Sequence, residues 1–218
     1  MSIELIRRGM TAAAAVFMIA GTEALSPGIV PVATAAGCPD IEVVFARGTS
    51  EGPGLGVVGS SLVANLRNKV GGRSVGSYAV NYPASYDFLA AADGANDASA
   101  HIQWMANNCP NTRLVLGGYS QGAAVMDVIA AVPISAVGFN NPLPPDAAAH
   151  VAGIAVFGNP TAKVGAPMTV SPVWAGKAID LCAPGDPICQ TDGQNFAAHT
   201  TYVPGYTNQA ARFLAGLL

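Results

Sequence analysis

Three serines of this chain stand in the pattern Gly-x-Ser-x-Gly: Ser50, Ser74 and Ser120. Such a serine is a candidate nucleophile when a buried strand runs into it and a helix begins directly after it. Ser120 meets both conditions, because the apolar run 113–116 precedes it and the helical segment 121–131 follows it. Ser74 lies between a predicted helix end and a predicted strand start, and a glycine- and proline-rich loop follows Ser50. The context therefore favours Ser120.

A serine hydroxyl is a weak nucleophile near neutral pH and needs an adjacent base, usually a histidine oriented by a carboxylate. Where the serine sits on a strand-to-helix turn, the order along the chain is serine, acid, histidine. Of the three histidines, His101 precedes Ser120, and His150 lies just before a predicted strand, at the wrong end of the sheet. His199, in the long loop after the last predicted strand, is the best candidate base.

The acid must be an aspartate, because no glutamate follows Glu51. Asp186 is favoured, since its loop is bounded by Cys182 and Cys189 and a clamped carboxylate can hold an imidazole in one tautomer. The remaining aspartates after Ser120 fit less well, because they lie in a helix, a proline-rich loop, a strand and a turn: Asp127, Asp146, Asp180 and Asp192.

A serine nucleophile also needs hydrogen-bond donors for the oxyanion that forms during acyl transfer. One is expected to be the N–H of Gln121, at the start of the helix that follows Ser120. The second is expected from Thr49, in the loop after the first strand, through its N–H and its hydroxyl. The alternative for Thr49 is an ordinary turn residue.

The elements around these residues alternate between strand and helix, which predicts an α/β domain with a mostly parallel sheet. Strands are expected at 41–46, 75–82, 114–117, 151–157 and 178–181. Helices are expected at 57–70, from a cap at Asp93 or Asn96 onward, at 121–131, and along an apolar stripe at 206–217. The proline-rich segment 133–145 is expected to be an exposed loop.

The first 36 residues read as a cleaved secretory signal peptide, followed by a single domain at 37–218. Arg7 and Arg8 precede an apolar run, 10–20, that is too short to span a bilayer, and Ala-x-Ala cleavage fits near Ala35 or Ala36. The alternative is an uncleaved membrane anchor. The sequence therefore predicts export.

Charge and composition exclude some classes of function. The net charge is −3, charged residues make up 11% of the chain, and the basic residues are scattered. Nucleic-acid binding is therefore not expected. The mean hydropathy is positive, which suits contact with apolar material.

The four cysteines suggest two disulfides, as is usual for an even count in an exported chain. Three pairings are possible, and we favour Cys182–Cys189 as a tight local loop, with Cys38–Cys109 tying the N-terminus to a helix end. A metal site is not expected, because the cysteine spacing and nearby histidines that zinc needs are missing.

Three segments, 45–51, 117–123 and 182–189, together with His199, resemble the cutinases, most closely the cutinase-like secreted esterases of mycobacteria. The resemblance implies a small lidless α/β-hydrolase, a three-layer sandwich with a central five-stranded parallel sheet. It implies the same disulfide pairing and no cofactor. It also assigns roles to five residues: Ser120 as nucleophile, Asp186 as acid, His199 as base, and Thr49 and Gln121 as oxyanion donors. Fungal members carry serine where Thr49 stands.

The expected function is hydrolysis of carboxylic esters, from short- to medium-chain fatty acyl esters to lipids or cutin-like polyesters, through an acyl-enzyme. The substrate is expected at an interface, and the protein is expected to be a monomer without a stable membrane span. The candidate acyl-contact residues flank the site on two sides: Tyr82, Tyr86, Phe88, Leu89, Phe196, Tyr202 and Val203. The alternatives are an envelope acyltransferase and a non-catalytic secreted surface module with the same fold.

Overall fold

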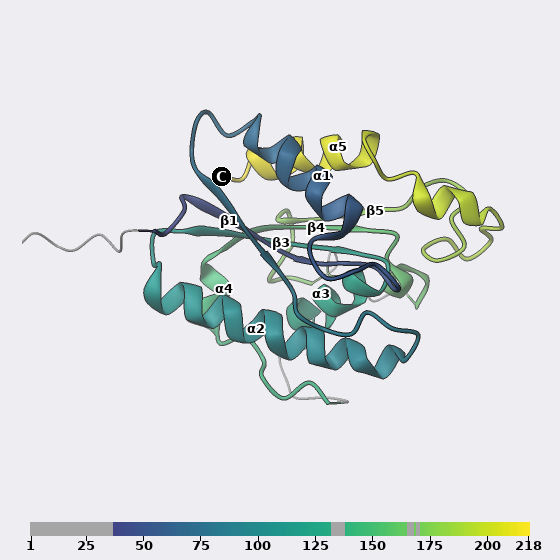
Figure 1. Cartoon of the computed structure of the whole chain (residues 1–218), viewed down its shortest axis with the longest axis horizontal. Helices are drawn as coiled ribbons and strands as arrows, with labels where there is room; N and C mark the ends of the chain where they lie inside the picture. The colour runs from purple at the N-terminus through teal and green to yellow at the C-terminus, as the bar shows by residue number, and fades with distance from the viewer. Residues whose placement is uncertain (1–36, 132–137, 165–167, 169–170) are drawn as a thin grey trace, which may run out of the picture. The chain divides into compact units, whose positions relative to one another are not determined.

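The computed structural model describes residues 37–131, 138–164, 168 and 171–218. The expected signal peptide, 1–36, lies outside the described residues, and so does part of the proline-rich segment, 132–137. The part of the chain that follows the expected leader folds into a single sheet with helices on both faces (Figure 1).

A five-stranded, all-parallel sheet forms the middle layer. Its order is β2-β1-β3-β4-β5, with the bounds β1 Ile41–Ala46, β2 Val75–Ala79, β3 Arg113–Tyr119, β4 Val151–Phe157 and β5 Ala178–Leu181. β3 lies at the centre, and β4 is buried along its whole length. A strand covered on both faces must be apolar on both faces, which explains the apolar sequence of β4, Val-Ala-Gly-Ile-Ala-Val-Phe.

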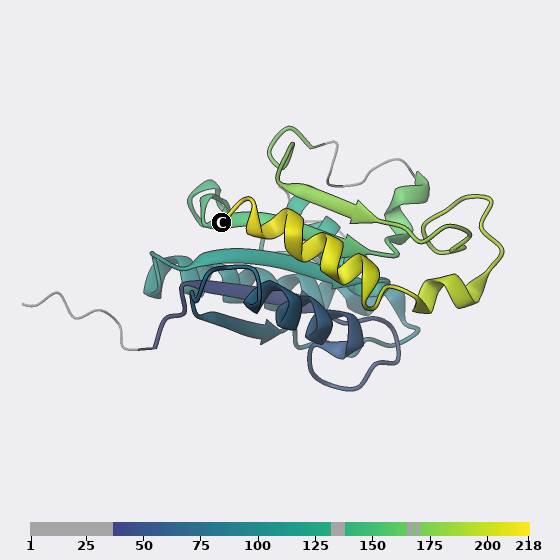
Figure 2. The ribbon, with the colours of Figure 1, turned by 90° about the horizontal axis from the view of Figure 1, so that it is seen from above.

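The helices form the two outer layers. α1 (Gly56–Arg67) and α5 (Gly205–Ala215) cover one face of the sheet, and α2 (Ala91–Asn108), α3 (Gln121–Ala131) and α4 (Pro145–Ala149) cover the other (Figures 1 and 2). Alternate residues of β1 enter the two cores: Val43 and Phe45 pack with α1 and α5, whereas Val44 packs with α2 and α3. The fold is therefore the expected three-layer α/β sandwich.

The predicted start of the second helix, at a cap on Asp93 or Asn96, was wrong. α2 begins at Ala91, because a 3₁₀ turn (Phe88–Ala90) leads directly into it. Asp87 caps that turn by accepting a hydrogen bond from the Leu89 N–H, so neither Asp93 nor Asn96 is needed as a cap. The second strand also ends three residues early, at Ala79.

The proline-rich segment holds one element that the sequence did not predict. Pro145 begins the short helix α4, where its fixed φ and missing N–H cause no loss. Phe139, in the same segment, is buried against the sheet. Where it is described, this segment is therefore partly folded into the domain rather than a fully exposed loop.

Candidate active site

Ser120 occupies a sharp turn between β3, which ends at Tyr119, and α3, which begins at Gln121. Its φ is +55°, in the left-handed region that non-glycine residues seldom adopt. The flanking glycines allow this turn. A Cβ at Gly118 would lie 2.1 Å from the Gly122 carbonyl oxygen, and one at Gly122 would lie 2.0 Å from the Ala46 carbonyl oxygen. Both glycines of the motif are therefore required sterically, and the hydroxyl projects from the carboxyl end of the sheet.

Ser120, His199 and Asp186 form a continuous chain of hydrogen bonds. The Ser120 Oγ lies 2.9 Å from His199 Nε2, and His199 Nδ1 lies 2.7 Å from Asp186 Oδ2. The Asp186 side chain is fully buried and that of His199 is 14% exposed. In this geometry the imidazole can take the serine proton while the buried carboxylate stabilises the resulting positive charge.

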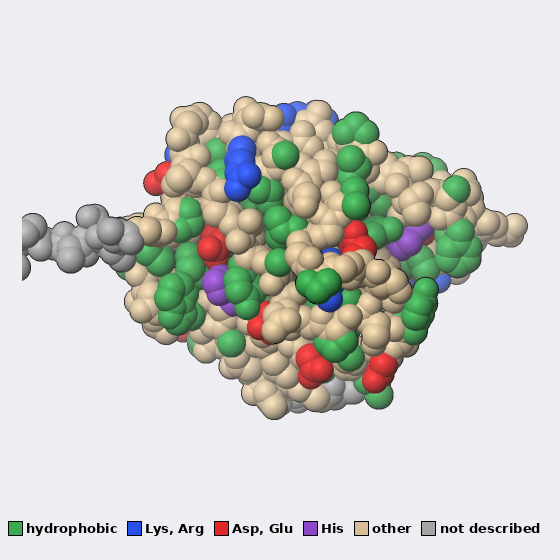
Figure 3. All heavy atoms as spheres, in the orientation of Figure 1, with side chains coloured by type: hydrophobic (Ala, Val, Ile, Leu, Met, Phe, Trp, Pro, Cys, Tyr) green, Lys and Arg blue, Asp and Glu red, His purple; other side chains and the backbone are tan. Residues whose placement is uncertain are grey.

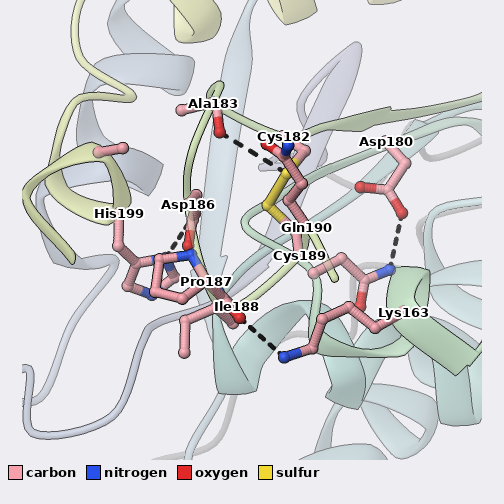
Figure 4. The surroundings of a disulfide bond; sticks show 12 residues. Lys163, Asp180, Cys182, Ala183, Asp186, Pro187, Ile188, Cys189, Gln190 and His199 are labelled. Carbon is pink, nitrogen blue, oxygen red and sulfur yellow. Dashed lines mark hydrogen bonds and ion pairs between the residues drawn. A yellow bond between two sulfur atoms is a disulfide. The ribbon is translucent and has the colours of Figure 1, made fainter. Parts of the chain in front are cut away.

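Asp186 is held on several sides. Its Oδ1 accepts the Ile188 N–H at 2.8 Å, and its Oδ2 also accepts the Tyr202 hydroxyl at 2.5 Å. The Cys182–Cys189 disulfide closes the loop, and Lys163 Nζ donates to the Pro187 carbonyl at 2.7 Å (Figure 4). These contacts fix the carboxylate independently of the imidazole.

Tyr202 was one of the candidate acyl contacts, and the structure gives it a different position. Its side chain is fully buried, its hydroxyl binds Asp186, and it accepts the Ala183 N–H at 3.1 Å. Burial, and then the bond to Asp186, raise its pKa above the usual value, so the hydroxyl stays protonated and can donate. Tyr82, another predicted contact, is also buried, and its hydroxyl donates to the Arg47 carbonyl.

Two further residues shape the space around the His199 ring. The Tyr119 hydroxyl donates to the His199 carbonyl at 2.6 Å, and the two rings stack with centroids 5.0 Å apart. Gly158 has φ +57°, and a Cβ there would lie 2.7 Å from His199 Cε1. The sequence did not indicate a role for Tyr119 or Gly158, because only the pairing of strands in the folded sheet brings these residues close to His199.

Two backbone N–H groups are free beside the serine. Within the described residues, neither the Thr49 N–H nor the Gln121 N–H donates a hydrogen bond. The loop that carries Thr49 is fixed by Arg47, whose guanidinium donates to the carbonyls of Glu51, Val80 and Tyr82. The two N–H groups can therefore be offered to a negatively charged oxygen.

A cavity of about 550 Å³ opens at Ser120. It is lined by Thr49, Gln121 and His199 and by mainly apolar side chains: Tyr86, Phe88, Ala91, Tyr119, Ala124, Pro160, Ile188 and Phe196. Three of the predicted contacts (Tyr86, Phe88 and Phe196) line it, whereas Leu89 and Val203 do not. Ile188 could have been suspected, because it follows Asp186 by two residues.

The rejected histidines and Ser74 lie elsewhere. His101 stacks on Tyr78 and pairs with Glu42 at 2.5 Å, and His150 ends α4 just before β4. Ser74 forms hydrogen bonds with Asp40 at the start of β2.

The rejected aspartates are likewise absent from the site. Asp127 and Asp180 both accept a hydrogen bond from Asn159 Nδ2, on the face of the sheet that α3 covers. Asp146 lies in the first turn of α4, and Asp192 lies in a turn, where it accepts a bond from Gln190.

Both disulfides pair as favoured. Cys38–Cys109 joins the start of the described chain to the end of α2, and Cys182–Cys189 closes the Asp186 loop. Within the described ranges there is no group of three or more His, Cys, Asp or Glu side chains that could hold a metal ion. No helix in the same ranges is long and apolar enough to cross a membrane.

The parallel five-stranded sheet and the serine on the turn after its central strand define an α/β-hydrolase. Residues 37–218 match the model of the family described as Cutinase. The chain therefore belongs to the cutinase family, and it is a carboxylic ester hydrolase.

Named relatives agree with this placement. The chain is 57% identical over 209 residues to the phospholipase Culp4 of Mycobacterium tuberculosis, covering 95% of this chain and 91% of that one. It is 50% identical over 211 residues to the probable carboxylesterase Culp3 of the same species, covering 95% and 80%. Among solved structures, a Trichoderma reesei cutinase in complex with a phosphonate inhibitor is similar, with a TM-score of 0.65, 33% identity, and 83% and 77% coverage.

Proposed function

We propose that this protein is a secreted serine esterase that cleaves carboxylic esters through a covalent acyl-enzyme. Ser120 is the nucleophile, His199 the general base and Asp186 the acid that orients it. The observation that carries the proposal is the hydrogen-bonded chain from Ser120 Oγ through His199 to Asp186, at 2.9 and 2.7 Å. An imidazole bonded on both sides has one defined tautomer, with its acceptor nitrogen facing the serine.

The proposed reaction has two steps. His199 Nε2 takes the Ser120 proton as Oγ attacks the ester carbonyl, and the N–H groups of Thr49 and Gln121 stabilise the oxyanion. The imidazolium then protonates the leaving alcohol, and an acyl-Ser120 remains. Water, deprotonated by the same histidine, attacks the acyl-enzyme and releases the acid.

We propose an apolar acyl chain as the preferred substrate feature, from short- and medium-chain esters to lipids or cutin-like polyesters. The cavity wall is mainly apolar, and three of its side chains stay largely exposed: Tyr86 at 77%, Phe88 at 64% and Phe196 at 70%. Such exposed aromatic groups at a cavity mouth suit a lipid or polymer surface. The relative named as a phospholipase supports testing phospholipids.

The surface around the site supports an interfacial substrate. Figure 3 shows hydrophobic side chains gathered around a histidine at the end of the molecule where, in Figure 1, the segment before α5 lies.

Every group in the Ser120–His199–Asp186 chain comes from one copy of the protein, so we propose that a monomer is active. Two disulfides support export, because such bonds persist in oxidising compartments.

The test uses the protein purified from culture medium and a series of p-nitrophenyl esters from acetyl to palmitoyl. Cutin and phosphatidylcholine vesicles are assayed in parallel. We expect saturable hydrolysis with a burst of p-nitrophenol equal to the enzyme concentration, and its loss in Ser120→Ala. Equal rates for the wild type and Ser120→Ala would refute the nucleophile. Product analysis with an added alcohol distinguishes hydrolysis from transfer of the acyl group to another acceptor.

A further inference from the structure

The Gln121 side chain is buried, with 3% of its surface exposed, although the proposed oxyanion role uses only its backbone. Its Nε2 donates to the Ser85 carbonyl at 3.0 Å, and its Oε1 lies 3.2 Å from Thr49 Oγ1. One carboxamide therefore touches two loops that are 36 residues apart in sequence.

The orientation of this carboxamide follows from its partners. The Ser85 carbonyl can only accept, so the amide nitrogen must face it, and the amide oxygen must then face Thr49. Because an amide oxygen only accepts, the Thr49 hydroxyl must donate to it. Its single proton is thereby directed at Gln121 and is not free for an oxyanion.

The two loops are also joined to each other. The Ser50 N–H donates to the Ala84 carbonyl at 2.7 Å, next to both contacts of Gln121. The segment after Ser85 carries Tyr86 and Phe88, which line the cavity. The Gln121 carboxamide thus closes a three-way junction between the turn at Ser120, the Thr49 loop and the apolar wall.

We propose that Gln121 is a positioning residue. Its carboxamide aligns the Thr49 N–H and the apolar cavity wall with Ser120. The Thr49 hydroxyl acts as an anchor for its loop through Gln121, and the backbone N–H groups bind the oxyanion. This inference rests on the proposed esterase function and assigns a role to a side chain that the nucleophile motif leaves unspecified.

The proposal predicts different effects from two shape-preserving substitutions. Thr49→Val keeps the N–H and removes only a long, neutral hydrogen bond, so kcat should fall about 2- to 12-fold, with KM unchanged. Removing a true oxyanion donor costs about 100- to 1,000-fold. Gln121→Leu removes both contacts, so kcat should fall and KM for p-nitrophenyl octanoate should rise more than KM for p-nitrophenyl acetate.

The double variant gives the sharpest result. If the hydroxyl acts through Gln121, then adding Thr49→Val to Gln121→Leu should lower kcat by less than twofold further. Thr49→Ser, which keeps the hydroxyl, should recover most of the kcat that Thr49→Val loses. Gln103→Leu is the matched control, because Gln103 is a partly buried glutamine with two side-chain hydrogen bonds on α2, away from the cavity.

A hydrogen-exchange measurement tests the positioning without turnover. Gln121→Leu should speed exchange of the hydrogen-bonded amides of Ser50, Glu51, Leu89 and Ala90, and Gln103→Leu should not. A 100-fold or larger loss of kcat in Thr49→Val, repeated in full in the Gln121→Leu background, would overturn the proposal, as would unchanged exchange. Failure of the esterase function itself would show differently, as equal turnover by the wild type and Ser120→Ala.

Discussion

The buried carboxyl of Asp180 should make the stability of this protein fall as pH rises through the mildly acidic range. Asp180 lies on β5, where its Oδ2 accepts from Asn159 Nδ2 and its Oδ1 has no partner among the described residues. Burial raises its pKa to about 6, and the nearby Asp127 carboxylate contributes in the same direction. The pKa of Asp127 is itself raised by burial.

The sign follows from proton binding. Between the unfolded pKa of 3.8 and the folded pKa of about 6, the folded state holds a proton that the unfolded state has lost. Stability is therefore greatest below pH 4 as far as this group is concerned, and it is lost as pH rises to about 6. The rise in pKa from 3.8 to about 6 corresponds to at most about 3 kcal/mol of unfolding free energy.

The perturbation is Asp180→Asn, which keeps the shape and an acceptor for Asn159 but carries no charge. At pH 7 to 8 the variant should be more stable than the wild type, by up to about 3 kcal/mol, and the difference should shrink towards pH 4. Urea unfolding followed by circular dichroism at several pH values measures this. Asp146→Asn, at an exposed carboxyl in the first turn of α4, is the matched control.

The reasoning is refuted if the difference in unfolding free energy between Asp180→Asn and the wild type stays constant from pH 4 to 8. It is also refuted if this difference grows towards acid. A constant difference would mean that the pKa of Asp180 is the same in the folded and unfolded protein, and a difference that grows towards acid would mean that folding lowers this pKa. The Asp146→Asn profile should run parallel to that of the wild type throughout.

Three further predictions concern the candidate site. Gly158→Ala should displace the His199 ring and lower kcat roughly 100-fold, whereas Gly176→Ala, at a positive φ with open space around it, should affect stability only, as kinetics and thermal unfolding would show. Tyr202→Phe removes a hydrogen bond to Asp186 and should lower kcat roughly tenfold with little change in KM; an unchanged kcat would mean that the remaining contacts suffice. Replacing Cys182 and Cys189 by serine should reduce activity at temperatures where circular dichroism still reports a folded protein, and coincident loss of both would argue against the loop clamp.

The parts of the fold that could be predicted are those specified locally. The strands 41–46, 151–157 and 178–181 were predicted with the bounds that the structure has, because each is a short, mainly apolar segment between turn signals. The turn at Ser120 could be predicted for a similar reason, since the strand, both glycines and the helix are neighbours in sequence. The start of α2 could not, because the preceding 3₁₀ turn has no distinct sequence pattern.

The support around the site could not be predicted, because it is built from residues that only the sheet order brings together. β4 lies between β3 and β5, so Gly158 at its end comes between the Ser120 turn and the Asp186 loop. The Tyr202 side chain reaches Asp186 from the segment that leads into α5. A tyrosine that packs in the core and a tyrosine that binds a buried carboxylate can occupy the same position in an apolar sequence pattern. Hydrophobic periodicity therefore cannot show which of these roles Tyr202 has.

The position of Asp180 shows why an acid cannot be chosen by burial alone. Asp180 and Asp186 are six residues apart; Asp186 is fully buried and Asp180 is partly buried, yet only Asp186 meets an imidazole. Asp180 belongs to the strand, so its side chain is directed at Asn159 and Asp127 on the α3 face. Asp186 lies beyond the strand end, where the disulfide-closed loop turns back towards His199. Of these two carboxylates, the one beyond the carboxyl end of β5 is therefore the one that can serve a nucleophile at that end of the sheet.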